Sequence, residues 1–149
     1  MATTNRVAVS WDQEYKPRLD ELFPAFADSP EGSARIHNID MFLICLSYGF
    51  STGMKRPIPP RISDAVRLES LKDSVWAVFR SIAVADTGSA NVLKSDDAVL
   101  DVVEQFAAGG LELLVKKFDE DPTQIRAWLT GDYFKAITKS PYSVKDSDN

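Results

Sequence analysis

A cluster of basic residues beside several prolines has the most readily named chemistry in this sequence. Pro57, Pro59 and Pro60 fix the backbone dihedral φ and lack amide donors, so the segment 51–61 is expected to form a stiff, extended arm. Four cations lie on this arm or just after it, with Asp64 alone opposing them: Lys55, Arg56, Arg61 and Arg67. Cations on a stiff arm lose little entropy on binding and suit phosphate groups, so these four are the candidate contacts to DNA or to a partner.

The charge balance of the chain offers a simpler explanation of the same cations. The formal net charge is −5, and the excess of acid lies in the second half: residues 1–67 contain eight basic and eight acidic residues, whereas residues 68–149 contain nine and fourteen. Exposed cations commonly form weak ion pairs with such acids. The acidity also argues against broad, non-specific binding to a polyanion, which needs many cationic contacts. Phosphate binding and surface ion pairing both stay open for the basic cluster.

A second group with potential chemistry is the triplet Asp86-Thr87-Gly88, which matches the catalytic triplet of aspartic proteases. In those enzymes two such carboxylates share one proton, within an all-β fold. Here the triplet follows an apolar pattern of helical period, and its glycine suits a helix C-cap. We therefore interpret the triplet as the end of a helix.

The residue types that bind metals or act as nucleophiles are scarce. His37 is the only histidine and Cys45 the only cysteine, so neither an internal disulfide nor a metal site of the usual Cys and His type can form. Cys45 lies in an apolar run and is expected to be a buried, inert thiol. The sequence contains no Gly-rich phosphate loop and no nucleophile elbow. We predict no catalytic residue, no metal and no cofactor.

Three carboxylates, those of Asp97, Asp101 and Glu104, have the spacing of one helical face. Carboxylates at such spacing usually cover a face in contact with water. We interpret this face as solvated or as a surface for docking another protein.

Length and composition are those of a single globular domain, with 149 residues of which 44% are hydrophobic. The alternating segment 6–11 predicts one short strand, and because a lone strand needs a partner, we expect pairing between subunits and hence a homo-oligomer. The domain should span 1–139, followed by a polar, disordered tail at 140–149. No segment is apolar for long enough to cross a membrane and no signal peptide is visible, so a cytoplasmic protein is expected.

Apolar residues at helical spacing predict a short helix from Pro17 and longer helices at about 39–48, 68–85, 96–118 and 122–130. The predicted fold class is therefore mainly α: a compact bundle of about five helices with one short N-terminal strand and the Pro-rich basic arm. The core is expected to consist of Phe42, Leu46, Val75, Phe79, Ile82, Val103, Phe106 and Leu114.

Polar and small residues place the ends of these helices. Asn38 is expected to cap the helix 39–48 and Gly49 to end it. Gly109 and Gly110 lie inside the helix 96–118, where each lowers helix propensity by about 1 kcal/mol. Either a neighbouring helix comes very close at these glycines or the helix breaks there, and the apolar residues around them favour the close approach.

Three segments carry a resemblance to a known family: 38–50 (NIDMFLICLSYGF), 82–88 (IAVADTG) and 104–112 (EQFAAGGLE). In this order, with the basic and proline-rich arm after the first, they resemble the Dnd system-associated protein 4 family, small accessory proteins of bacterial DNA phosphorothioation. The resemblance covers roughly residues 36–118. It extends more distantly to DndE, the small helical subunit of the same system.

The resemblance implies a role in a bacterial system that marks DNA with backbone sulfur and restricts unmarked invading DNA, as an anti-phage defence. It carries over no catalytic residue. Our first hypothesis is a non-enzymatic accessory or regulatory subunit that acts through protein partners of the defence system, without a membrane. The alternative is a small oligomeric protein that binds double-stranded DNA and contacts phosphates through the basic arm.

Overall fold

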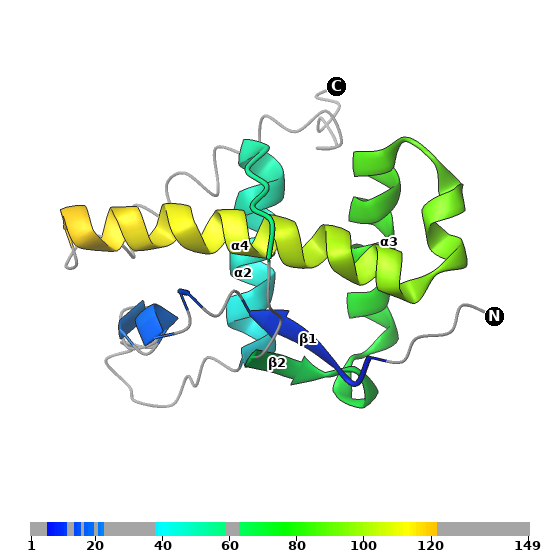
Figure 1. Ribbon diagram of the computed structural model, residues 1–149, viewed down its shortest axis with the longest axis horizontal. Coiled ribbons are helices and arrows are strands. Elements are labelled where there is room, and N and C mark those ends of the chain that lie inside the picture. Colours follow the sequence, from blue (N-terminus) through cyan, green and yellow to red (C-terminus); the bar gives the residue numbers. More distant parts are fainter. Residues whose placement is uncertain are drawn as a thin grey trace, which may run out of the picture.

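The computed structural model describes residues 6–11, 14–15, 17–19, 21–22, 38–58 and 63–121 (Figure 1). Its elements are strand β1 (Ala8–Trp11), helix α2 (Asn38–Thr52), strand β2 (Ser63–Arg67), helix α3 (Asp73–Thr87) and helix α4 (Asp96–Glu120), with short 3-10 helices η1 (Leu68–Ser70) and η2 (Ala90–Lys94). The mainly helical fold class is confirmed, although among the described residues the number of helices differs slightly from five. The predicted helix 122–130, the tail 140–149 and His37 lie outside the described residues.

Helices α2 and α4 cross each other at glycines (Figure 1). A Cβ atom on Gly110 would overlap the carbonyl oxygen of Cys45 and lie 2.9 Å from the amide nitrogen of Gly49. A Cβ atom on Gly49 would likewise overlap the carbonyl oxygen of Phe106. The close approach predicted at Gly110 is confirmed, and α4 passes through it unbroken. The prediction that Gly49 ends the helix 39–48 is wrong, because α2 continues to Thr52 and this glycine lies inside it, where it lets α4 approach.

Strand β1 pairs with β2 of the same chain, so it is not the lone strand from which pairing between subunits was predicted. The two strands are antiparallel, with Val9 opposite Val66 and a shift of register between Val9 and Ser10. The chain continues the pairing beyond β2, where the amide of Leu68 donates to the carbonyl oxygen of Val7 at 3.0 Å. This pairing delays the start of α3 to Asp73, five residues after the predicted start of the helix 68–85.

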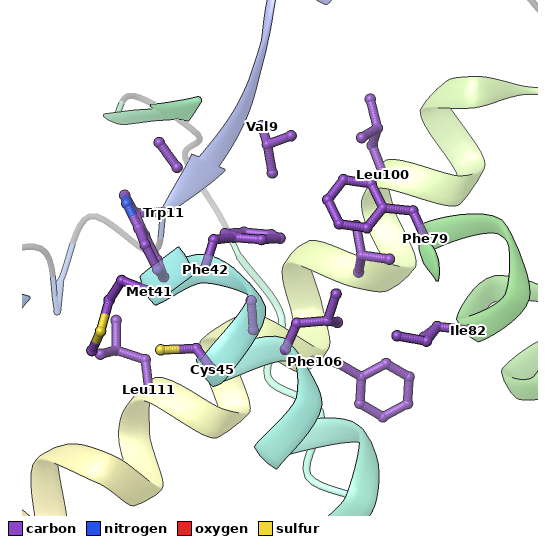
Figure 2. Packing of buried hydrophobic residues seen from close by; sticks show 14 of the residues in the cluster. Val9, Trp11, Met41, Phe42, Cys45, Phe79, Ile82, Leu100, Phe106 and Leu111 are labelled. Carbon is purple, nitrogen blue, oxygen red and sulfur yellow. The ribbon is translucent and has the colours of Figure 1, made fainter. Parts of the chain in front are cut away.

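The core lies between the strand pair and the three long helices (Figure 2). The ring of Phe42 stands 5.2 Å from that of Trp11 and 5.8 Å from that of Phe79, centroid to centroid. Seven of the eight predicted core residues are buried, and the eighth, Val75, is half-buried against them. Cys45 is buried as predicted, and its burial raises the pKa of the thiol above the ordinary value. The helical periodicity therefore identified the core correctly.

Local capping sets the ends of α3 and α4. Helix α3 ends at Gly88, whose φ of 69° is the left-handed conformation that glycine adopts without strain. This confirms the interpretation of the triplet 86–88 as a helix end. Helix α4 begins after Ser95, whose hydroxyl accepts a hydrogen bond from the amide of Ala98 at 3.2 Å.

Candidate functional site

The segment that carries Lys55 and Arg56 lies against α4. The amide of Arg56 donates to the carbonyl oxygen of Gln105 at 3.0 Å, and a Cβ atom on Gly109 would overlap the carbonyl oxygen of Met54. Figure 1 shows the chain leaving α2 and running across α4. A projecting, proline-rich arm is therefore not confirmed over residues 54–58, and Arg61 lies outside the described residues.

Lys55 bridges two helices. Its ammonium nitrogen lies 2.6 Å from Oδ2 of Asp86, near the end of α3, and 5.2 Å from the ring centroid of Phe106 in α4. An ion pair combined with a cation–π contact fixes the side chain and offsets its charge. Lys55 thus joins the segment after α2 to both α3 and α4.

Arg56 is held by three side chains from other parts of the chain. Its guanidinium pairs with Glu14, lies 3.5 Å from Oε2 of Glu112 in α4, and stacks over the ring of Tyr15 at 4.5 Å. Only a quarter of its side chain is exposed. Arg56 therefore holds the residues near 14–15 against α4.

Arg67 lies in β2, apart from these contacts. Its nearest ionic partner is Glu69 at 3.3 Å, and 76% of the Arg67 side chain is exposed. Because an ion pair this exposed contributes little free energy, the guanidinium could exchange Glu69 for another anion at little cost. Of the three described candidate cations, Lys55 and Arg56 serve tertiary contacts and Arg67 is accessible.

Glu104 corrects the interpretation of the acidic face of α4. Its side chain is 1% exposed and pairs with Arg6, and its Oε2 accepts a hydrogen bond from the amide of Ser10 at 2.6 Å. Asp101, half-exposed, lies 3.2 Å from the same arginine. The prediction of a solvated face is wrong for Glu104, because its carboxylate satisfies a backbone amide of β1 and a partly buried guanidinium. A sequence signal existed: Glu104 lies four residues after Leu100, on the buried side of α4.

An apolar groove that was not predicted from the sequence lies between α2, α3 and η2, and we call it the α3 groove. It has a volume of about 650 Å³ and is lined by Phe50, Arg80, Ser81, Ile82, Val84, Ala85 and Leu93. Phe50, near the end of α2, and Leu93, in η2, are 38% and 36% exposed. Such a groove provides an apolar surface for binding rather than a set of groups for acid–base chemistry.

A signal for the α3 groove is present in the sequence of α3. The exposed positions of this helix include Ser74, Ala77, Val78, Ser81 and Ala85, of which Val78 is 44% exposed. The solvent face of a helix normally carries charged side chains. The charged residues exposed on α3 are Asp73, Arg80 and Asp86, and the five positions between and beside them carry no charge. The apolar stripe of α3 indicates only its buried side, whereas the absence of charge at these exposed positions indicates the groove.

Two further findings limit the chemistry of the described part of the chain. Among the described residues, no group of three or more His, Cys, Asp or Glu side chains is placed to hold a metal ion. Within the same residues, none of the helices combines the length and the apolar character needed to cross a membrane.

Comparison with known proteins identifies a family. The family described as DNA sulphur modification system-associated protein 4 matches residues 21–140, which include α2, β2, α3, α4 and the α3 groove. No curated protein and no solved structure matches the chain. Because the family match spans well over half of the sequence, this chain belongs to the DNA sulphur modification system-associated protein 4 family.

Proposed function

We propose that this protein is a non-enzymatic accessory or regulatory subunit of a bacterial DNA sulphur modification and restriction system, and that it acts by binding other proteins of that system. The α3 groove is the observation that carries the proposal. Family membership supports the assignment to the system, since the family is named for its association with DNA sulphur modification. The groove supports action through a protein partner.

The groove has the composition of a protein-binding surface. Exposed aromatic and aliphatic side chains lose unfavourable contact with water when a partner covers them, and contiguous apolar patches on monomers commonly mark interaction sites. Phe50 and Leu93 are the large exposed side chains of this kind that line the groove, and Val78 is a further exposed apolar side chain on α3. Arg80 at its edge adds the residue type that, with aromatics, is enriched in interfaces.

Co-purification from the native system tests this function. The tagged, full-length protein is produced in a host that carries the complete set of modification and restriction genes, and the proteins retained with it are identified by mass spectrometry. We expect at least one protein encoded by those genes to be retained. We also expect deletion of the gene for this chain to change either the phosphorothioate content of the DNA or the restriction of unmodified phage, with recovery on complementation. If the chain retains none of these proteins and its deletion changes neither property, the proposed function is wrong.

The second candidate is an oligomeric protein that binds double-stranded DNA phosphates through Lys55, Arg56, Arg61 and Arg67. The exposure of Arg67 and its weak pair with Glu69 favour it. Opposing it are the carboxylates that pair with Lys55 and Arg56, since a phosphate would have to displace them. The salt dependence of DNA binding separates the two candidates.

A further inference from the structure

We propose that the α3 groove binds an amphipathic helix of a partner protein, with apolar side chains in the groove and an acidic side chain facing Arg80. The inference rests on the proposed function and adds the chemistry of the partner segment. Three features carry it: the outer face of α3, the apolar anchors of the groove, and the charge at its edge.

The outer face of α3 lets another helix come close. Ala77, Ser81 and Ala85 are spaced four residues apart and are exposed, so their small side chains lie in one row along the helix. The separation of two packed helices depends on the side chains at their contact, and small ones allow the shortest separation. The row borders the groove, since Ser81 and Ala85 also line it.

The apolar anchors are held in place before any partner arrives. Phe50 packs edge-on against the ring of Phe106, with centroids 5.4 Å apart and an interplanar angle of 88°. Ile82 is almost fully buried, whereas Leu93 is partly exposed. A surface that is already ordered loses little conformational entropy on binding. An amphipathic helix fits such a groove by presenting side chains at positions i, i+3 or i+4, and i+7.

Charge favours an acidic partner over a second copy of this chain. Arg80 is the one charged side chain among the described residues that line the groove, and it lies 5.1 Å from the ring centroid of Trp76. A two-fold contact between copies brings the same patch of both molecules together. Such a contact would place two Arg80 side chains in the same interface without adding an acid from the groove, since no acidic residue is among its described lining. An aspartate or glutamate on the partner helix gives the opposite, complementary arrangement.

Single substitutions in the full-length protein test the site. Ala85→Glu places a longer, charged side chain in the groove at an exposed helical position, where glutamate has good helix propensity. Arg80→Glu reverses the charge at the edge. Lys72→Glu is the matched control for Arg80→Glu, because it also replaces a basic residue with an acidic one, at an exposed position just before α3 and outside the groove. Far-ultraviolet circular dichroism and thermal unfolding verify that each variant folds.

Each variant is co-expressed with the proteins of the modification and restriction system, and retention of the partner is compared with wild type. Ala85→Glu is expected to weaken retention at least about tenfold, as loss of a central interface contact does. Arg80→Glu is expected to weaken retention less, because it opposes two acids at the edge of the interface, and Lys72→Glu to leave it unchanged. A photo-crosslinking residue in place of Ser81 should attach to a segment of the partner in which apolar residues recur every three or four positions. An Asp or Glu should lie beside this apolar stripe. Replacing that acid with Arg should restore binding to Arg80→Glu.

The outcomes distinguish this inference from the function on which it rests. If wild type retains a partner and both groove variants retain it equally, the inference is wrong and the proposed function stands. Crosslinking of position 81 to a second copy, or to a segment without helical period or acid, also overturns the inference. If wild type retains no protein of the system, the inference fails. The proposed function fails with it when deletion of the gene also changes neither the phosphorothioate content of the DNA nor the restriction of phage.

Discussion

At the scale of single residues, Glu104 carries a charge on the buried side of α4. Its carboxylate pairs with Arg6 and accepts a hydrogen bond from the amide of Ser10. Without Glu104, strand β1 would present this amide donor without a partner. A buried ion pair does not by itself add much stability, but removing one partner leaves the other charge uncompensated. Glu104 thus attaches the N-terminal strand to α4.

Glu104→Ala is expected to lower the free energy of unfolding by about 3 kcal/mol, because it removes the buried acceptor of the Ser10 amide and the buried one of the two carboxylates that pair with Arg6. Urea denaturation followed by circular dichroism measures the change. Asp101→Ala is the control, since it removes the exposed partner of the same arginine and should cost less than about 1 kcal/mol. Equal effects of the two substitutions would show that the buried carboxylate has no special role.

At the scale of elements, the crossing of α2 and α4 determines how the core is assembled. The two helices meet through backbone atoms at Gly49 and Gly110, with no side chain between them. The backbone of Met54 packs equally closely on Gly109, where a Cβ atom would overlap the carbonyl oxygen of Met54. The segment after α2 therefore lies directly on α4. The Gly-Gly pair therefore serves two neighbours, a helix and an extended segment.

Gly110→Ala is expected to destabilise the protein by about 3 kcal/mol or more, although alanine normally stabilises a helix relative to glycine by about 1 kcal/mol. The reason is that the added methyl group must separate α2 from α4. Thermal unfolding measures the loss. Gly88→Ala provides the comparison: a Cβ atom there meets no other residue, and only the positive φ opposes it, so a cost of about 1 kcal/mol is expected. A more stable Gly110→Ala variant would mean that the helices do not touch here.

At the scale of the whole molecule, the net charge of −5 bears on DNA binding. Lys55 and Arg56, which sequence reasoning assigned to phosphates, are paired with carboxylates from distant parts of the chain. Arg67 pairs with Glu69, and both side chains are exposed. DNA binding through the basic cluster would therefore require the protein to exchange internal ion pairs for phosphates.

The salt dependence of DNA affinity tests this alternative. Four phosphate contacts imply that log affinity falls with log salt at a slope of about −3.6 for double-stranded DNA. Replacing Arg61 and Arg67 with Ala should reduce that slope to about −1.8 and weaken binding to all sequences alike, since phosphate contacts carry no base information. Lys72→Ala, outside the cluster, should leave the slope unchanged. Absence of binding by wild type at low salt would exclude this alternative.

The sequence by itself determined the features that depend on neighbours along the chain. Helix α4 is capped by Ser95 and α3 ends at Gly88 because a cap needs only residues within one turn. Apolar spacing identified most of the core for the same reason, since a helix places residues three and four apart on one side. The three segments that carry the family resemblance are likewise short stretches of neighbouring residues, so they could be identified without the structure.

The tertiary structure alone decided the features that join distant residues. Arg6 and Glu104 are 98 positions apart, and Lys55 and Asp86 are 31 apart. The role of Gly49 inside α2, the pairing of β1 with β2 and the α3 groove all arise where separate elements meet. Helical period cannot specify these features, because the free energy of a buried ion pair or a close helix crossing depends on which surfaces the folded chain brings together.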